Sequence, residues 1–574
     1  MNEQTLKTVF SGLLHDVGKM VYRAGENRDH ASAGYAYLKE RLKDAAWQDV
    51  LDGVRWHHAP ALRRANAAEN STAYIVCVAD NVAAAADRRE IEGESTRFDR
   101  TLPLNSVFTH LNGEHPGLAL EPCAHDGKLH LPGRQPPVTA AQYQALLAIF
   151  SQGLQGIEIS EAWLDSLLAL LECCTANVPS STYTGESPDI SLYDHLKITA
   201  AVGACISEYL LDQGAADIRT RVFQNEKAFR DEQVFVLYTA DLSGIQKFIY
   251  TVSTDGALKS LRSRSFFLEL LMEHYVDELL AACQLSRVNL LFHGGGQCHL
   301  LLPKTGAVEE ALAVWNRKFN NWLIQEFGIS LYMDHGWVAC SGNDLVNEPA
   351  AESPYEKVFC NLNQKVERRK LRRYDAGQLL TLNREKLDTQ GRECKVCGRM
   401  DRLVDLAGQN EPPDLRCPWC KRFLEMSKQL VERDVYVVYR VLDEKEKTNL
   451  PSIDEKTVKL PLPAADGRVY LCLEPEETAC AHLKGERAVV RIYSKKFLPK
   501  LPGSIRLDMG DYVYRKHAAQ KDLPTMEELA ACSRGIQRIA VCRMDVDNLG
   551  AAFHSGFQKE GETDPVKRQR FVNL

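Results

Sequence analysis

The 574-residue sequence has no long apolar run, no low-complexity segment and little net charge. No stretch stays apolar for the roughly 20 residues that a membrane helix needs, and the N-terminal residues lack the pattern of a secretory signal. The formal net charge is −7, so overall charge gives no indication of a nucleic-acid-binding protein. We therefore expect a soluble, cytoplasmic protein in which any contact with nucleic acid uses local patches.

The composition is that of an ordinary globular protein, with 45% hydrophobic and 26% charged residues. A chain of this length is expected to hold several domains, each with its own core. Its 17 cysteines are scattered and accompany no secretion signal, so we expect reduced thiols rather than a disulfide framework. Three basic clusters are most simply read as solvated faces. They are Lys259 with Arg262 and Arg264, residues 365–373, and Lys495 with Lys496 and Lys500.

The order of the sequence patterns predicts a multidomain α+β protein. Residues 1–100 are rich in helix formers with apolar faces, and helical patterns return from 140 to about 212. Between them, the stretch 114–137, rich in Gly, Pro and His, indicates a loop or domain boundary. Strand patterns follow, first in the apolar run before Asp241 and later in Val-Tyr-Val-Val-Tyr-Arg-Val at 435–441.

The N-terminal helices carry a set of metal-ligand residue types. His15 and Asp16 stand at the end of an apolar helical run, and Gly18 and Lys19 follow directly. Further candidates on later predicted helices are His30, His57, His58 and Asp80. Imidazole and carboxylate suit borderline divalent metals, and a bound ion lowers the pKa of water enough to supply hydroxide for attack on a phosphodiester.

A lone His-Asp pair is more often a helix cap or a surface feature, but the whole set favours a metal-dependent phosphohydrolase. Lys19, one helical turn beyond His15, is placed to steady a phosphate oxygen. His57 and His58 would diverge by about 100° on one helix, so one of them is expected to be an indirect partner of the metal or a substrate contact. Mn²⁺, Ni²⁺ and Co²⁺ fit mixed His/Asp ligation, and Mg²⁺ is a further candidate.

Two Cys-x-x-Cys knuckles give the most specific local signal. They are formed by Cys394, Cys397, Cys417 and Cys420, at the spacing of a zinc ribbon. Four thiolates leave no open position on a tetrahedral ion, so the predicted zinc is structural. The alternative is four unrelated free thiols.

A carboxylate motif appears twice, far apart in the chain. Asp241 precedes Leu-Ser-Gly, and Asp545 and Asp547 stand in Met-Asp-Val-Asp-Asn-Leu-Gly; each motif follows an apolar run of strand type. Palm-type nucleotidyl transferases present metal-binding carboxylates in this way. The first copy has glycines at 294–296 where a catalytic palm has acidic residues, so it suits nucleotide binding rather than two metals. In the second copy, which has two carboxylates, Asp545 is the preferred metal ligand, with the Val546 carbonyl as a further candidate; the alternative is a surface turn.

The order of these motifs is similar to that of the large HD–palm subunit of type III-A (Csm) CRISPR effector complexes. The resemblance covers the chain from end to end and rests on the His15-Asp16 segment, the two palm motifs, the stretch Leu261-Arg-Ser-Arg-Ser-Phe-Phe and the cysteine knuckles. It implies an HD domain that cleaves single-stranded DNA with a metal held by His15 and Asp16. It also implies palm domains that bind two ATP molecules and make cyclic oligoadenylates, with Mg²⁺ or Mn²⁺ at Asp545.

The resemblance further implies an antiviral complex with guide CRISPR RNA, target RNA and other Csm subunits, especially the small subunit and the guide-handle-binding subunit, and no membrane. The implied nucleotide-binding residues are Asp241, Ser243, Gly244, Arg262, Ser263, Gly294, Gly295 and Gly296. The expected domains are a helical HD domain (1–110), a helical linker region (111–220), a ferredoxin-like first palm (221–375), a linker domain with the zinc ribbon and strands (376–525) and the start of a second palm (526–574).

This sequence departs from the family pattern at its C-terminal end. Family members follow the second motif with a Gly-Gly-Asp-Asp hairpin and a helical C-terminal domain, and neither stands between Gly550 and Leu574. We therefore expect a chain truncated within the second palm, with an incomplete cyclase site and a whole nuclease site.

Two other functions are compatible with the sequence. A stand-alone HD phosphohydrolase would hydrolyse small nucleotides without partners, although it leaves the palm motifs and the cysteine knuckles unexplained. A non-catalytic scaffold would assemble with guide and subunits and show no metal-dependent activity.

Overall fold

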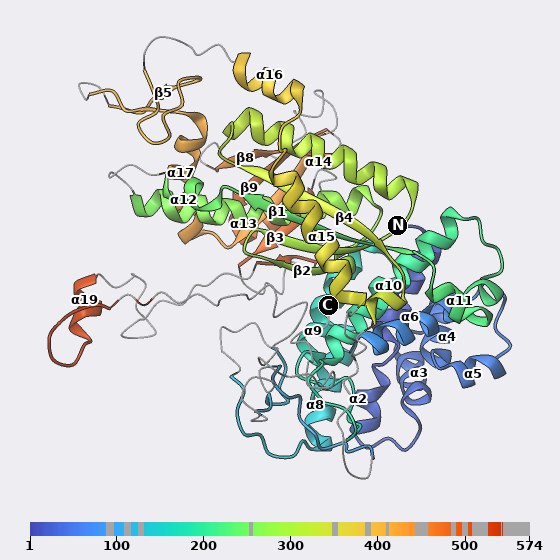
Figure 1. The fold of residues 1–574 in the computed structure, drawn as a ribbon. Coiled ribbons are helices and arrows are strands. Elements are labelled where there is room, and N and C mark those ends of the chain that lie inside the picture. The colour runs from blue at the N-terminus through green and yellow to red at the C-terminus, as the bar shows by residue number, and fades with distance from the viewer. Residues whose placement is uncertain are drawn as a thin grey trace, which may run out of the picture.

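The computed structural model of the chain describes residues 1–87, 97–107, 116–123, 131–251, 257–346, 354–384, 392–408, 412–441, 457–465, 467–483, 489–495, 503–507, 526–540 and 542. Figure 1 shows the N-terminal helices, in blue, gathered at one side and the strands of two sheets beyond them. None of the described helices is both long and apolar enough to cross a bilayer. The second palm motif, with Asp545 and Asp547, lies outside the described residues, as do Lys496 and Lys500.

The N-terminal helices form a bundle around α10 (Leu192–Asp212), which packs along α1 (Glu3–Leu14) and α6 (Thr72–Asp87). α1 and α10 approach closely because a Cβ at Gly12 would lie 2.7 Å from the Ala200 Cα. The prediction of helices in the first part of the chain is confirmed as far as Asp87. The other helices here are α2 (Gly18–Arg23), α3 (His30–Arg41), α4 (Gln48–Trp56), α5 (Ala59–Arg64), α8 (Ala140–Gly153), α9 (Leu164–Thr175) and α11 (Glu226–Arg230).

The position of α10 changes the expected division of the chain. Residues 111–220 are predicted from the sequence as a linker region, yet α10 lies inside the bundle that α1 and α6 build. Its middle is buried on nearly every side, which explains the continuous run of small and apolar residues from Ile198 to Ile206. The helical bundle therefore takes in residues from both predicted segments.

The first sheet has the strand order β2-β3-β1-β4, with all neighbours antiparallel. Its strands are β1 (Phe235–Ser243), β2 (Leu290–Gly294), β3 (Gln297–Pro303) and β4 (Tyr332–Cys340). Two long helices, α13 (Ala257–Ala282) and α14 (Gly306–Phe327), connect β1 to β2 and β3 to β4. This βαββαβ order is the ferredoxin-like arrangement, so the predicted palm fold is confirmed. α15 (Pro354–Lys370) packs against β4 and β1.

The chain turns sharply where β1 ends. Gly244 has φ +97°, and a Cβ there would lie 2.0 Å from the Ser330 carbonyl oxygen. A side chain is therefore excluded at this position for both backbone and steric reasons. The turn starts α12 (Ile245–Tyr250) directly after the strand end that carries Asp241 and Ser243.

The second sheet has the order β11-β10-β7-β9-β8. Its strands are β7 (Val435–Val441), β8 (Lys459–Leu462), β9 (Arg468–Glu474), β10 (Val489–Ser494) and β11 (Ile505–Arg506), so the strand predicted at 435–441 is confirmed. The remaining elements are α16 (Ala376–Arg384), the short pair β5 (Val404–Asp405) and β6 (Leu415–Arg416), α17 (Pro418–Glu432), α18 (Glu476–Leu483) and α19 (Met526–Ala531).

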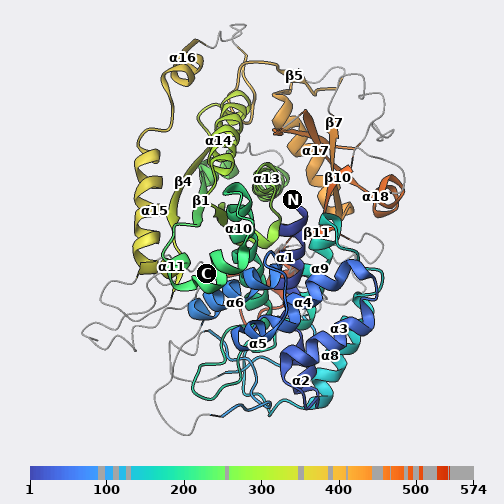
Figure 2. The ribbon, with the colours of Figure 1, turned by 90° about the vertical axis from the view of Figure 1, so that its right-hand side faces the viewer.

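Helix α13 joins the two sheets. Figure 2 shows it between β1 and β4 on one side and β7 and β10 on the other. Its Glu278 carboxylate is fully buried and accepts hydrogen bonds from Arg440 of β7 and Arg491 of β10. The Ala465 amide donates to the second oxygen over 3.0 Å. One buried carboxylate thus ties two neighbouring strands of the second sheet to α13.

We expect Glu278→Ala to lower the free energy of unfolding by about 3–5 kcal/mol, because it removes the shared, fully buried acceptor of two partly buried guanidinium groups. Chemical denaturation measures the loss, and hydrogen exchange should place it in β7 and β10. The exposed Glu310 of α14 is a matched control, and Glu310→Ala should change stability by less than about 0.5 kcal/mol. Equal effects of the two substitutions would contradict the role of Glu278.

Candidate metal centre

The candidate ligands stand where helices end or begin. α1 ends at Leu14, so His15 and Asp16 occupy the turn before α2. His30 is the first residue of α3, and His57 follows the last residue of α4. Because the chain changes direction at each of these points, side chains from separate helices converge on one place.

The first group of ligand atoms comes from His15, Asp16, Asp80 and His195, all buried, with one ligand atom of each within 4.8 Å of the others. The His195 Nε2 lies 3.4 Å from the Asp16 Oδ2 and 3.2 Å from the Asp80 Oδ1. The His15 Nε2 lies 3.4 Å and 3.5 Å from the same two oxygens. Two imidazoles and two carboxylates thus surround one point, as a borderline divalent ion requires.

The second group comes from His30, His57 and His58, whose ligand atoms also lie within 4.8 Å of one another. The other oxygen of Asp16, Oδ1, lies 3.4 Å from the His30 Nε2 and 3.5 Å from the His57 Nε2. The His58 and His30 Nε2 atoms are 2.8 Å apart. Asp16 therefore presents one carboxylate oxygen to each group.

His57 and His58 do not share a helix, which overturns the premise of the sequence argument about them. His57 is the C-cap of α4, whereas His58 is extended (φ −91°, ψ 131°) and is the N-cap of α5, which has Pro60 in its first turn. The two rings lie 4.1 Å apart, centroid to centroid, and both belong to the second group. The break between the helices removes the 100° divergence that would separate neighbours.

The hydrogen bonds of two rings fit a metal ion. The Nδ1 of His15 lies 2.8 Å from the Gly12 carbonyl, and that of His57 lies 2.7 Å from the Val54 carbonyl. Because a carbonyl only accepts, each Nδ1 carries the proton and Nε2 is left with its lone pair in the neutral ring. Both Nε2 atoms are buried without a hydrogen-bond partner. A metal ion would satisfy them, and the backbone bond that fixes each ring is typical of histidine ligands.

The charges of the cluster favour a cation at its centre. Burial lowers the pKa of His15, but the Asp16 and Asp80 carboxylates outweigh it and raise the pKa to about 9. Burial raises the pKa of Asp16, yet Lys19 and His15 hold it well below its usual range. Burial lowers the pKa of His57 to about 3. At neutral pH the Asp16 carboxylate is thus charged and the His57 ring is neutral, while His15 holds a proton that a metal ion would displace.

His195 is the residue that sequence reasoning missed. It lies in the first turn of α10, far along the chain from the other ligands, and its neighbour Asp194 belongs to the helix cap formed by Ser191. The signal that could have found it is this second adjacent acid–imidazole pair at a helix end. Capping explains Asp194 by itself, so only the packing of α10 against α1 and α6 identifies His195.

A cavity of about 590 Å³ opens over the cluster. Asp16, Asp80, His30 and His195 lie in its lining, together with Lys19. The Lys19 Nζ lies 2.5 Å from the Asp16 Oδ2, and the side chain is 21% exposed. Lys19 thus lies beside the cluster with part of its surface open to the cavity, where the sequence places a phosphate contact.

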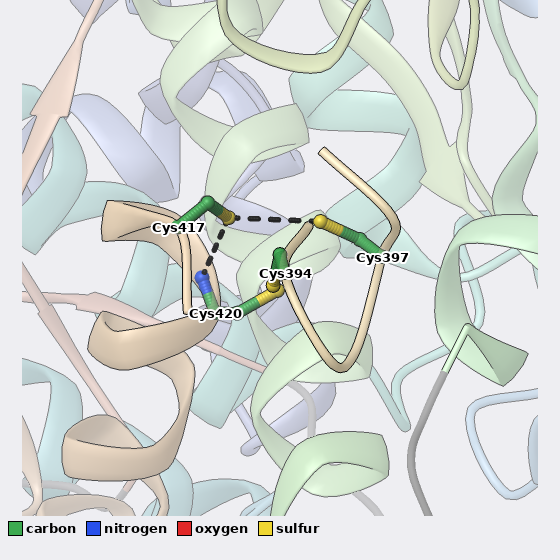
Figure 3. Close-up of side chains that lie close together, drawn as sticks. All are labelled: Cys394, Cys397, Cys417 and Cys420. Atoms are coloured by element: carbon green, nitrogen blue, oxygen red, sulfur yellow. Dashed lines mark hydrogen bonds between the residues drawn. The ribbon is translucent and has the colours of Figure 1, made fainter. Parts of the chain in front are cut away.

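The four knuckle cysteines converge as their spacing predicts. Their sulfur atoms lie within 4.8 Å of one another, and Figure 3 shows them turned toward a common centre. The Cys397 and Cys417 sulfurs are 3.7 Å apart, and Cys417 is the N-cap of α17. The turn around 394–397 and the start of α17 thus bring four thiols together, the ligand set of a structural zinc ion.

At the first palm, three of the predicted nucleotide-binding positions, Asp241, Gly295 and Gly296, gather at one end of the strands. Asp241 is paired across the sheet with Gln297 on one side and with Asp334 on the other. The Leu242 amide donates to the Gly296 carbonyl over 2.9 Å, and Gly295 and Gly296 form the β2–β3 turn with positive φ. The strand end and the glycine turn are therefore neighbours.

Two cationic side chains, one at the end of α15 and one just after it, lie against these strand ends. The Lys370 Nζ lies 2.9 Å from the Asp241 Oδ2. The Ser243 hydroxyl donates to the buried Asp334 carboxylate over 2.7 Å and accepts from Arg373 over 2.8 Å. Lys370 and Arg373 belong to a basic cluster that the sequence suggests is a solvated face; both side chains are partly exposed, and both also pair with carboxylates of the sheet.

The predicted positions on α13 behave differently. The Ser263 hydroxyl is buried without a hydrogen-bond partner, and Arg262 is half-buried. The neighbouring Arg264 is buried and donates to the Phe248 carbonyl over 3.0 Å and to the Cys420 sulfur over 3.2 Å. Its assignment to a solvated face is therefore wrong, because it links the palm to the cysteine knuckle.

The fold and the cluster together define a class of protein: an HD-type metal protein joined to a palm domain. Residues 1–85 match the HD domain family, and residues 234–385 match the family described as Csm1 subunit domain B. The chain is 34% identical over 602 residues to the CRISPR system single-strand-specific deoxyribonuclease Cas10/Csm1 (subtype III-A) of Mycobacterium tuberculosis, with 98% of this chain and 71% of that protein covered. The protein of the same name from Enterococcus italicus is 32% identical, with 98% and 72% covered.

Solved structures share the fold. A Csm1–Csm4 subcomplex of the type III-A CRISPR-Csm interference complex matches with a TM-score of 0.66 and 24% identity, over 99% of this chain and 67% of that chain. A Csm1–Csm4 cassette in complex with one ATP matches with a TM-score of 0.64 and 24% identity, over 94% of this chain and 64% of that chain. The chain thus spans about two thirds of these structures. It belongs to the Cas10/Csm1 family of subtype III-A CRISPR systems. The resemblance that the sequence motifs suggest is thus confirmed.

Proposed function

We propose that this chain cleaves single-stranded DNA at a centre of two divalent metal ions in its helical bundle. The observation that carries the proposal is the position of Asp16, whose two oxygens face two separate groups of ligands at the floor of one cavity. The relatives from Mycobacterium tuberculosis and Enterococcus italicus are named as single-strand-specific deoxyribonucleases. Mn²⁺, Ni²⁺, Co²⁺ and Mg²⁺ are the candidate ions.

Divalent ions bound there would supply a water of lowered pKa and neutralise charge on a phosphate. The chain's own residues prepare this site. Asp16 and Asp80 give it negative charge, and the Nδ1 bonds to backbone carbonyls fix the rings of His15 and His57. Lys19 adds a cation at the cavity wall, where it would hold a phosphate oxygen of the DNA.

The first palm suggests a second function, nucleotide binding. Asp241, Ser243 and the glycine turn lie together at one end of the strands. Lys370 and Arg373 bring positive charge to this place. A Csm1–Csm4 cassette of the same fold has been solved with ATP, and others with cA3 and cA4. We propose that ATP binds at this end of the strands and that zinc is the ion of the cysteine knuckle. We place the chain in a cytoplasmic complex with a Csm4-type subunit, guide RNA and target RNA.

The nuclease proposal is tested with His195→Ala, which removes a ligand that is not in the HD sequence motif. The full chain with Mn²⁺ should cleave a single-stranded oligodeoxynucleotide, leave its duplex intact and lose activity with a chelator. His195→Ala should slow cleavage by at least about 10- to 100-fold, since loss of even an indirect metal partner costs that much. His299→Ala, on β3 of the palm, is the matched control and should cleave normally.

Other outcomes separate the alternatives. Hydrolysis of deoxynucleoside triphosphates with no cleavage of DNA would favour a stand-alone phosphohydrolase. Assembly with guide RNA and a Csm4-type subunit without any metal-dependent cleavage would favour a scaffold. Full activity of His195→Ala would contradict the ligand set.

A further inference from the structure

An exposed aromatic ring stands at the mouth of the metal cavity. The Phe98 side chain is 70% exposed, although it lines the same cavity as Asp16 and His30. Phe98 is neither a metal ligand nor the phosphate contact of the proposed nuclease. An apolar ring this open to water, in the lining of the same cavity as the charged cluster, is a candidate binding element, because exposed apolar groups at cavities often mark binding sites.

The position of the ring is fixed. The Phe98 and Tyr183 rings lie 5.3 Å apart, centroid to centroid, at an angle of 46°. Their backbones form an antiparallel bridge. On either side of it, the Asp99 amide donates to the Thr182 carbonyl and the Thr184 amide to the Arg97 carbonyl, each over 2.9 Å. Phe98 is thus an exposed ring on a braced backbone.

A second aromatic side chain lines the cavity, and a guanidinium group stacks on it. Tyr22 lines it, and the Arg100 guanidinium stacks on the Tyr22 ring with its carbon 3.6 Å from the centroid. Lys19 adds a further cation at the wall. Aromatic faces interleaved with cations are what proteins use to bind single strands, because bases stack on the rings while cations attract the phosphates.

We infer that Phe98, braced by Tyr183, is a stacking platform for one base of single-stranded DNA next to the phosphate at the metal centre; the inference rests on the nuclease function proposed above. A base in a single strand is free to leave its neighbours and lie on the ring. In a duplex both faces of each base are covered and its edge is paired, so the ring has nothing to bind. The platform therefore contributes to the preference for single strands.

The test compares Phe98→Ala with the unaltered full chain in Mn²⁺. KM for a single-stranded oligodeoxynucleotide should rise by about 5- to 100-fold, the range that base–aromatic stacking supports. The kcat should stay within about twofold, because the ligands of the metal are untouched. Phe98→Trp should restore KM. Tyr250→Ala removes an aromatic ring that is 67% exposed on α12 of the palm and should leave both constants unchanged.

An abasic substrate identifies the contact. With the unaltered chain, one abasic position beside the cleaved bond should raise KM as much as Phe98→Ala does, and the same position should cause no further rise in the variant. An unchanged KM for Phe98→Ala, or equal additional losses from the abasic position in both proteins, would overturn the platform.

A binding readout separates this inference from the nuclease proposal. 2-Aminopurine in the oligodeoxynucleotide loses fluorescence when it stacks, and we expect quenching with the unaltered chain and Phe98→Trp but not with Phe98→Ala. If no protein cleaves DNA and the quenching pattern holds, the nuclease proposal fails and the platform stands. If cleavage is normal and Phe98→Ala quenches fully, the platform fails and the nuclease stands.

Discussion

Asp16→Asn should abolish cleavage of single-stranded DNA, with a loss of at least about 1,000-fold and of both bound metal ions. The substitution keeps the shape of the side chain and removes its charge. Each oxygen of Asp16 lies 3.4 Å from an imidazole nitrogen of a different ligand group, His195 on one side and His30 on the other. An amide offers one oxygen and one NH₂ group, and the latter cannot bind a cation. One ion thus loses its shared ligand, and the other keeps only a neutral oxygen in place of the charged one, which weakens both sites.

Metal analysis and cleavage rates of the full chain measure this result. The unaltered chain should bind two divalent ions in the bundle, and Asp16→Asn should bind none tightly. Asp52→Asn is a matched control, because Asp52 lies on α4 of the same bundle and bonds to Gln48 rather than to the cluster. A variant at Asp16 that keeps one ion and a tenth of the activity would contradict a shared ligand.

The same cluster shows how far sequence reasoning reaches at a metal site. His15 and Asp16 are adjacent, so one short motif identifies them, and the neighbouring helix pattern places them at a helix end. His195 could not be found in this way, because its role depends on the packing of α10 between α1 and α6. The helix break between His57 and His58 could be read from Pro60, which begins a new helix.

In the palm, the strands can be predicted from the sequence, but the pairing between them cannot. The apolar run before Asp241 predicts β1, and the apolar residues on either side of Gly294–Gly296 predict the β2–β3 hairpin and its turn. Asp334 has no local signal: it lies within an apolar strand, and its partner Ser243 is distant in the chain. The antiparallel register of β1 and β4 brings them together. A buried carboxylate whose hydrogen-bond partner lies on a neighbouring strand cannot be identified before the strand pairing is known.

The cysteine knuckle is the opposite case, since its four ligands lie in one short segment and spacing alone predicts them. What spacing cannot show is the connection to the palm. The Arg264 guanidinium bonds both the Cys420 sulfur and the Phe248 carbonyl of α12. The Trp419 ring, beside the knuckle, lies 5.1 Å from that of Phe267 on α13 and 4.9 Å from that of Phe327 on α14. The knuckle is thus packed into the core that α13 and α14 share.

Cys394→Ser should therefore remove the zinc and unfold the knuckle together with the start of α17. Structural zinc supplies about 10–16 kcal/mol of folding free energy in small zinc-binding peptides, which exceeds the stability of most domains. Without it, the thiolate that Arg264 contacts loses its place, and the contacts of Trp419 with α13 and α14 weaken. We expect the unaltered chain to contain one zinc ion per chain and the variant none, with fast hydrogen exchange across 392–432.

The cleavage of single-stranded DNA should survive this change, since the helical bundle builds its metal centre from residues before 200. Cys360→Ser provides the matched control, because Cys360 is an exposed cysteine on α15 outside the knuckle, and it should keep both zinc and exchange protection. A Cys394→Ser protein that loses zinc without faster exchange in α17 would show that the aromatic packing holds the knuckle by itself. Loss of DNA cleavage in the same variant would instead show that the knuckle supports the bundle through the palm, by way of α13 and the β3–α10 contact.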